Sequence, residues 1–160
     1  MKRIILLKIK LLYILLLVVI MFSCIKTTYC EENKLGLGLG WPYFGLKYNF
    51  SKRINSEFRW ATGEGINVYA GRVYWNFYCD EKMKGFTGLE GGYIGFDTLE
   101  MEGNGYEGSV FLGGEYYLTK RLSLELDLSP AFIGLKSDDY RVSGVEFIAN
   151  ISIYYYFLGN

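Results

Sequence analysis

The residues most capable of chemistry in this 160-residue chain are carboxylates spaced two apart, of which Glu125 and Asp127 are the clearest pair. Such a pair suggests general acid/base catalysis, which also needs a partner base and a cleft. The chain contains no histidine. It therefore lacks the usual general base, the Ser-His and Cys-His dyads and the commonest metal ligand. We expect no enzymatic activity, no cofactor and no metal site.

Glu125 and Asp127 lie in a segment that alternates strictly between apolar and polar residues. Leu122, Leu124, Leu126 and Leu128 occupy one phase, while serines and the two acids occupy the other. A period of two is the signature of a strand with two different faces. Turn signals between similar runs place strands near 34–41, 43–50, 54–61, 66–78, 85–97, 106–118, 122–135 and 144–157. The fourth and fifth are least regular, which predicts a bulge or kink near Gly71 or Gly91-Gly92.

A sequence segment that occurs twice in similar form supports a count of eight strands. Residues 48–58 resemble residues 116–126, which lie 68 positions later. If both are tight hairpins, four strands separate them, at about 17 residues per strand and connection, which suits membrane strands of about 9 to 11 residues. We predict an all-β fold: an eight-stranded antiparallel up-and-down transmembrane β-barrel over residues 34–160, preceded by a signal peptide over residues 1–30.

The charged residues of these strands fall on the phase that we predict to face inward. An eight-stranded barrel leaves room inside for side chains only, so these groups should pair and block an open channel. Three bases against six acids predicts unpaired carboxylates, and a narrow cation pathway is the alternative. The predicted interior polar network consists of Lys47, Glu57, Arg59, Arg72, Glu90, Glu115, Glu125, Asp127 and Glu146.

Alternation alone does not say whether the apolar phase meets lipid outside or lines a soluble barrel. Glycines on the polar phase, such as Gly36 and Gly38, suit a cramped interior. Aromatics of the apolar phase gather at both strand ends, as at membrane interfaces, although core packing is an alternative. One predicted belt contains Phe50, Trp75, Phe77, Tyr116, Tyr155 and Phe157, and the other contains Trp41, Phe44, Trp60, Phe132 and Phe147.

The N-terminus has the three parts of a secretory signal: a basic stretch, the apolar run 11–22 and small or polar residues up to Cys30. Cleavage after Cys30 and lipidation of Cys24 are both open. Cys79 alone lies in the folded part, so we expect it to be a passive turn residue without a disulfide framework. Beyond residue 30, 12 basic and 17 acidic residues give a net charge of −5, which disfavours nucleic acid as a partner.

Residues 34–160 resemble the small outer-membrane β-barrels of the OmpA and OmpX type, most clearly in the hairpin 115–126. The resemblance implies an outer-membrane location, membrane lipid and the outer-membrane assembly machinery as partners, and a monomer. It places the turns 51–53, 79–84 and 119–121 in the periplasm. Phe157 is followed by Leu158-Gly159-Asn160, a departure from the family's terminal aromatic. We expect a structural or envelope-stability role; the alternatives are a lipid-anchored lipocalin-like barrel for a small apolar ligand and a minor narrow channel.

Overall fold

The computed structural model describes residues 34–98 and 102–157, which form eight strands. The expected signal peptide with Cys24 and Cys30, and the C-terminal Leu158-Gly159-Asn160, lie outside the described residues. The strands are β1 (Lys34–Gly40), β2 (Tyr43–Asn49), β3 (Ile54–Gly63), β4 (Ile66–Cys79), β5 (Met83–Asp97), β6 (Glu102–Tyr117), β7 (Leu122–Ser137) and β8 (Arg141–Tyr156). Each overlaps a strand predicted from the sequence, and in the described residues no helix is long and apolar enough to cross a membrane.

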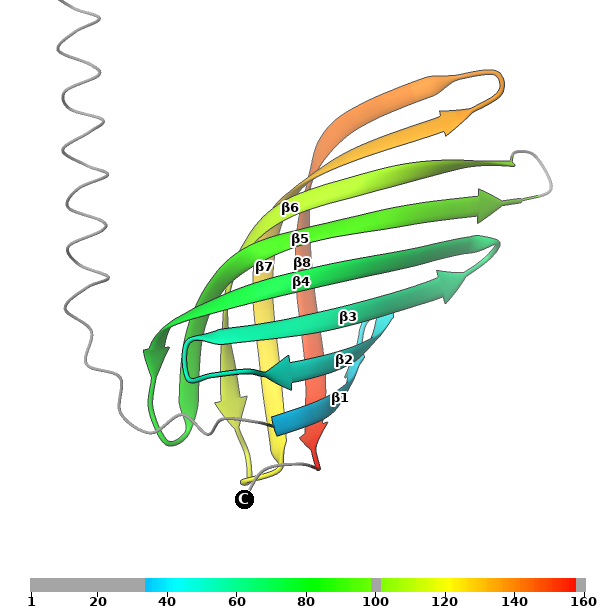
Figure 1. Ribbon diagram of the computed structural model, residues 1–160. Helices are drawn as coiled ribbons and strands as arrows, with labels where there is room; N and C mark the ends of the chain where they lie inside the picture. The colour runs from blue at the N-terminus through cyan, green and yellow to red at the C-terminus, as the bar shows by residue number, and fades with distance from the viewer. Residues whose placement is uncertain (1–33, 99–101, 158–160) are drawn as a thin grey trace, which may run out of the picture.

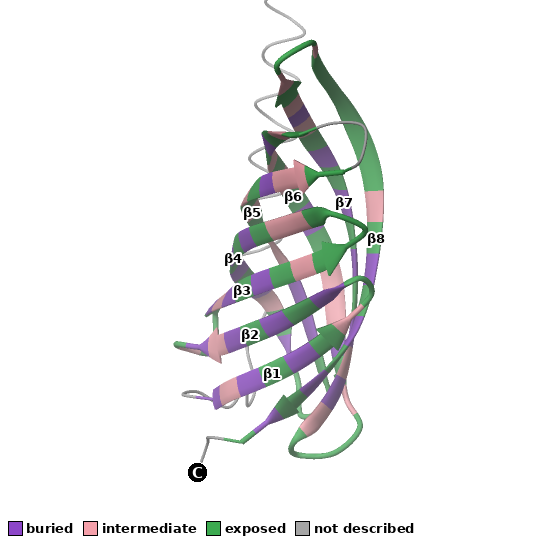
Figure 2. Cartoon of the chain, turned by 90° about the vertical axis from the view of Figure 1, so that its right-hand side faces the viewer, coloured by how far each residue is buried: buried purple, intermediate pink, exposed green. Residues whose placement is uncertain are grey.

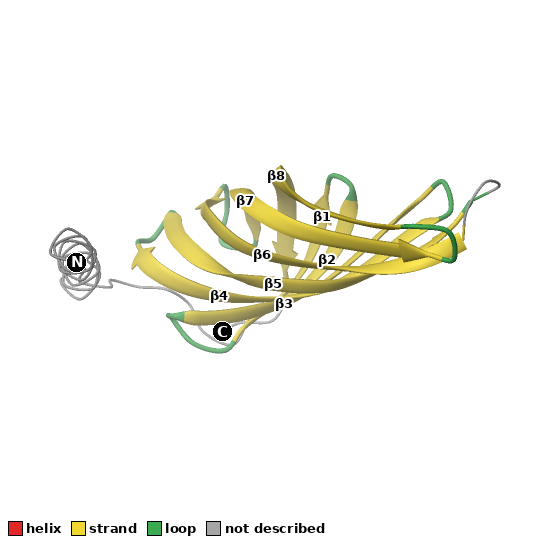
Figure 3. Ribbon diagram, turned by 90° about the horizontal axis from the view of Figure 1, so that it is seen from above, coloured by secondary structure: helices red, strands yellow, loops and turns green. Residues whose placement is uncertain are grey.

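The eight strands form one closed antiparallel barrel in chain order, with β8 returning to β1 (Figure 1). Seen from above, strands make up the wall and short loops join them at the two rims (Figure 3). Directly paired residues can be followed from strand to strand round the barrel. Starting at Gly36 on β1, this path ends at Glu146 on β8. Gly36 itself pairs with Tyr156, ten residues further along β8. This stagger inclines the strands by roughly 40° to the barrel axis.

The strands differ greatly in length, so the wall is not equally tall all round. We call the end with the β2–β3, β4–β5 and β6–β7 turns the lower rim, and the opposite end the upper rim. β1 and β2 have 7 residues each, whereas β6, β7 and β8 have 16. β8 pairs with β1 only from Ser152 to Tyr156, followed by one bond from Trp41 N–H to the Ile151 carbonyl (3.2 Å). The upper part of β8 therefore has a strand neighbour on its β7 side only, and the β7–β8 hairpin extends past the end of β1 (Figure 1).

Burial alternates along most of the sheet, as the period-two pattern predicted, and the alternation is lost in the upper part of β8 (Figure 2). On β7, Glu125 and Asp127 are 0% and 1% exposed, whereas the intervening Leu126 is 53% exposed. The polar phase therefore faces the lumen and the leucine phase faces outward. In the described part of the strands, charged residues on the outward phase occur only at upper strand ends: Asp97, Glu102, Lys136 and Arg141.

Two sequence predictions about β4 are wrong. The register shift lies between Asn76 and Tyr78, not at Gly71 or Gly91-Gly92, where pairing is regular. The extra residue brings Phe77 over Gly85, which has no side chain to oppose it. Cys79 is buried at the end of β4 and is disulfide-bonded rather than passive.

Candidate functional site

The lumen of the barrel is the candidate site, because the charged side chains of the strands meet there. Seven of the nine residues predicted for the interior are fully or almost fully buried: Lys47, Glu57, Arg59, Arg72, Glu115, Glu125 and Asp127. The side chain of Glu90 is 14% exposed and pairs with Arg72. The prediction is wrong for Glu146, which is exposed. Glu146 has the inward phase, but it lies on the upper part of β8, where β1 no longer faces it.

Strand register places opposite charges next to each other on four consecutive strands. Lys47 on β2 pairs with Glu57 on β3, Glu57 with Arg72 on β4, and Arg72 with Glu90 on β5. Opposite charges directly across from each other stabilise neighbouring strands. This charge ladder runs round half of the lumen and fixes the height at which the ion pairs form.

Two basic side chains of the charge ladder also reach across the lumen to the opposite wall. Lys47 forms a buried ion pair with Glu125 on β7, and its Nζ lies 3.5 Å from Glu115 Oε2 on β6. Arg72 donates two bonds of 2.9 Å to the two carboxylate oxygens of Asp127 on β7. Bidentate arginine–carboxylate pairs are among the strongest charge-assisted bonds in proteins. These pairs tie distant strands together and fill the space between them.

Buried tyrosines, which the sequence analysis did not assign to the interior, complete the bonding of the carboxylates. Glu57 accepts hydrogen bonds from the hydroxyls of Tyr74 and Tyr154. Tyr156 donates to Glu115 Oε1 at 2.6 Å. Tyr154 and Tyr156 flank the outward residue Tyr155, so a period of two assigns both to the inward face. Residue type alone does not distinguish the three, because tyrosine suits either face.

The structure also corrects the predicted excess of acid in the lumen. Lys34 and Lys84 are 7% and 3% exposed and lie inside the lower end of the barrel. The alternation predicts a fifth strand that begins only at residue 85, so Lys84 was not among the expected interior residues. The basic residues of the lumen are Lys34, Lys47, Arg59, Arg72 and Lys84, and the acids are Glu57, Glu90, Glu107, Glu115, Glu125 and Asp127. Five bases against six acids make the lumen nearly neutral.

Glycines on the inward phase of β1 and β2 make room for the tyrosines. A Cβ added to Gly38 would lie 2.4 Å from the ring of Tyr154, and one added to Gly36 would lie 2.7 Å from the ring of Tyr156. Both distances are far below van der Waals contact, so any larger residue would collide with a packed ring. The glycine-rich polar phase noted in the sequence thus has a steric cause.

The interior changes character above the charge ladder. The inward phase of β4 to β7 there carries Ala70, Ile94 and Ala131, which are 5%, 7% and 1% exposed. Glu107 is the half-buried acid among them. The lumen is therefore polar in its lower part and largely apolar in its upper part.

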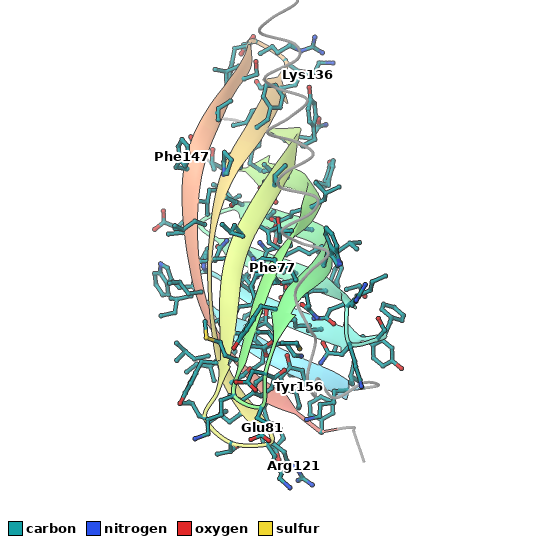
Figure 4. The ribbon with its side chains drawn as sticks, turned by 90° about the vertical axis from the view of Figure 1, so that its left-hand side faces the viewer. Phe77, Glu81, Arg121, Lys136, Phe147 and Tyr156 are labelled. Atoms are coloured by element: carbon teal, nitrogen blue, oxygen red, sulfur yellow. The ribbon has the colours of Figure 1, made fainter. Side chains whose placement is uncertain are left out.

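Most of the predicted belt aromatics point outward. Ten of the eleven are exposed: Trp41, Phe44, Phe50, Trp60, Trp75, Tyr116, Phe132, Phe147, Tyr155 and Phe157. Figure 4 shows Phe147 pointing away from the wall, and its exposed fraction is 86%. Phe77, at the bulge, is half-buried. Tyr69, Tyr93 and Tyr106, which the sequence analysis did not assign, are also exposed on the outward phase.

The lumen holds a network of paired charges. The buried carboxylates of Glu57, Glu115, Glu125 and Asp127 are bonded to arginine, lysine, tyrosine, serine or asparagine. Within residues 34–98 and 102–157, no group of three or more His, Cys, Asp or Glu side chains is arranged to hold a metal ion. No protein-family model matches the chain, and no curated protein sequence matches it either.

Proposed function

We propose that this chain is an exported, integral outer-membrane β-barrel with a structural or envelope-stability role, a side-chain-filled interior and no catalytic activity. The observation that carries the proposal is the separation of the two faces of a closed sheet. Leu126 and Ile151 face outward at 53% and 51% exposure, while Glu125 and Asp127 are buried inside. Water outside the barrel would favour the opposite arrangement.

The height of the uncharged outer surface fits a bilayer. On β7 the outward phase from Leu122 to Gly134 carries no charge. At about 3.3 Å per residue and a tilt of about 40°, this stretch rises by about 30 Å, close to the apolar band of about 25 Å in outer-membrane barrels. The first charge above it is Lys136, which Figure 4 shows at the upper end.

The exposed aromatics support the same placement. Trp75, Tyr116 and Tyr155 lie near the lower rim, and Trp60, Tyr106 and Phe132 lie higher on the outer surface. Tyrosine and tryptophan favour the interface between hydrocarbon and headgroups, because each has an apolar body and a polar tip. Exposed aromatics at two heights are consistent with two interfaces.

The lumen disfavours both alternative functions. A lipocalin-like barrel needs an apolar lumen, whereas here the lower lumen contains Lys47, Arg72 and their carboxylate partners. A channel needs a continuous water path, and these pairs cross the lumen at its centre. We therefore expect no steady conductance in planar bilayers, and large reproducible channels would contradict a filled interior.

The proposal is tested by refolding the purified mature protein into neutral phosphatidylcholine vesicles. We expect an unheated sample to migrate faster on a gel than a boiled one, and the protein to remain with the vesicles after alkaline carbonate washing. A monomer that stays soluble without detergent and leaves the vesicles on washing would overturn the proposal.

A further inference from the structure

The two rims of the barrel carry opposite charge. The turns of the lower rim contain Lys52, Arg53, Lys82, Lys120 and Arg121 against Asp80 and Glu81. The described residues of the upper rim contain Glu64, Asp97, Glu102, Asp138 and Asp139 against Lys136 and Arg141. Figure 4 shows Glu81 and Arg121 at one end and Lys136 at the other. The lower rim is therefore net basic.

Two of the lower turns have the same construction. In the β2–β3 turn the Ser51 hydroxyl accepts hydrogen bonds from the backbone N–H groups of Arg53 (3.3 Å) and Ile54 (3.0 Å). In the β6–β7 turn the Thr119 hydroxyl accepts the equivalent bonds from Arg121 (3.2 Å) and Leu122 (3.0 Å). The two turns lie in the two similar sequence segments, residues 48–58 and 116–126. Both present an adjacent Lys-Arg pair, half a barrel circumference apart.

Neighbouring strands hold the backbones of both pairs in place. Asn76 donates from its side chain to the Lys52 carbonyl (3.0 Å) and from its backbone N–H to the Arg53 carbonyl (2.8 Å). On the other side, Tyr156 N–H donates to the Arg121 carbonyl at 2.7 Å. The carbonyl groups are thus fixed.

The four basic side chains of these turns remain available to a ligand. Lys52, Arg53, Lys120 and Arg121 are all exposed, and none forms an ion pair with another described residue. The two Lys-Arg pairs are therefore held on rigid backbones with their charges directed to the surroundings.

The apolar residues next to each pair set its depth. Phe50 and Ile54 flank the first turn at 56% and 50% exposure, and Leu118 precedes the second at 53%. If these side chains lie in hydrocarbon, the Lys-Arg pairs lie in the adjoining headgroup layer, at the level of the lipid phosphodiester groups. Arginine binds phosphate oxygens with a two-pronged donor and lysine acts as a point charge.

We propose that the two Lys-Arg turns bind the headgroups of anionic phospholipids in the leaflet at the lower rim. This inference rests on the proposed membrane insertion, which sets the depth of the turns. The flanking apolar residues favour lipid over an acidic protein partner, because such a protein would have to approach through the headgroup layer. The described residues of the upper rim include no comparable basic pair.

The test compares phosphatidylglycerol with phosphatidylcholine as neighbours of the inserted barrel. Spin-labelled lipids of each kind are added to vesicles of phosphatidylcholine that hold the refolded protein, and the motionally restricted fraction is measured. We expect a preference for phosphatidylglycerol of about fivefold, the factor that one Lys or Arg near an anionic surface supplies. The preference should fall toward unity in 0.5 M salt, as expected for exposed charges.

A fourfold variant, Lys52→Gln, Arg53→Gln, Lys120→Gln and Arg121→Gln, should lose the preference while still showing the heat-modifiable gel shift. The matched control, Lys136→Gln with Arg141→Gln at the upper rim, should keep it. Insertion with equal restriction of both lipids, or a preference that survives in the fourfold variant, would overturn the inference and leave the proposed function intact. Failure to insert into phosphatidylcholine would instead overturn both.

Discussion

The lower and upper halves of the barrel bury different kinds of residue, although most of the strands run through both. In the lower half all eight strands are paired, and the lumen holds Lys47, Arg72 and their partners. In the upper half β1 and β2 have ended, the edge of β8 is unpaired on one side, and the inner surface carries Ala70, Ile94 and Ala131. Among the residues that the structure describes, fully buried charges occur only where the wall closes.

Asp127 and Glu146 show the consequence most directly. Both are acids on the inward phase of neighbouring strands, and sequence periodicity treats them alike. Asp127 accepts bonds from Arg72 and Asn150 and is 1% exposed. Glu146 is exposed and forms no ion pair with another described residue. Closure, and not phase, makes a charged residue part of the network, because only a closed wall excludes water and supplies partners on all sides.

The largest expected effect is that of Asp127→Asn, which removes the charge that pairs with Arg72. Removing one partner of a buried pair destabilises by about 3 to 5 kcal/mol, and we expect about 3 because Arg72 retains Glu90. Urea unfolding in detergent micelles, followed by tryptophan fluorescence, measures the change. A loss below about 1 kcal/mol would show that the crossing pairs contribute little to stability.

Next in size is Leu126→Arg, which puts a charge on the outward face in the middle of the barrel. In a bilayer this change destabilises by about 2 to 4 kcal/mol, whereas an arginine near the interface costs about 0 to 1. Ser143→Arg, on the outward phase of β8 near the upper rim, is the matched control. Stability of each variant is measured by unfolding from phosphatidylcholine vesicles, and equal losses in both would contradict a difference in depth.

A smaller effect is expected for Gly38→Ala, because the added methyl group would meet the ring of Tyr154 at 2.4 Å. Overpacking of this kind costs about 1 to 3 kcal/mol. Gly91→Ala is the control: its Cβ would meet nothing within 4 Å. The same unfolding measurement should leave the control unchanged or slightly more stable, since alanine restricts the unfolded chain. A neutral Gly38→Ala would mean that Tyr154 moves freely aside.

The smallest effect is that of Glu146→Gln, the upper-half counterpart of Asp127→Asn. Exposed substitutions away from special features change stability by less than about 0.5 kcal/mol. We expect this variant to unfold at the same urea concentration as the unaltered protein. A loss comparable with that of Asp127→Asn would mean that the upper half buries charge as the lower half does.

The alternation of residue types was enough to predict eight strands, their order and the phase of nearly every charged residue. Glu57 and Arg59 illustrate this, since two residues along a strand return a side chain to the same face. The alternation could not predict which charged residues pair across the lumen. The pair of Arg72 with Asp127 joins residues 55 positions apart, and its formation depends on strand stagger and barrel radius.

The sequence by itself determined which face of each strand is polar, because that choice depends only on a period of two within one segment. Only the tertiary structure decided where the wall closes, which neighbours meet across the lumen and why Glu146 and Lys84 differ from their expected surroundings. Those outcomes depend on the relative lengths and register of strands far apart in the chain. Register is set when all eight strands pair at once, so no single segment encodes it.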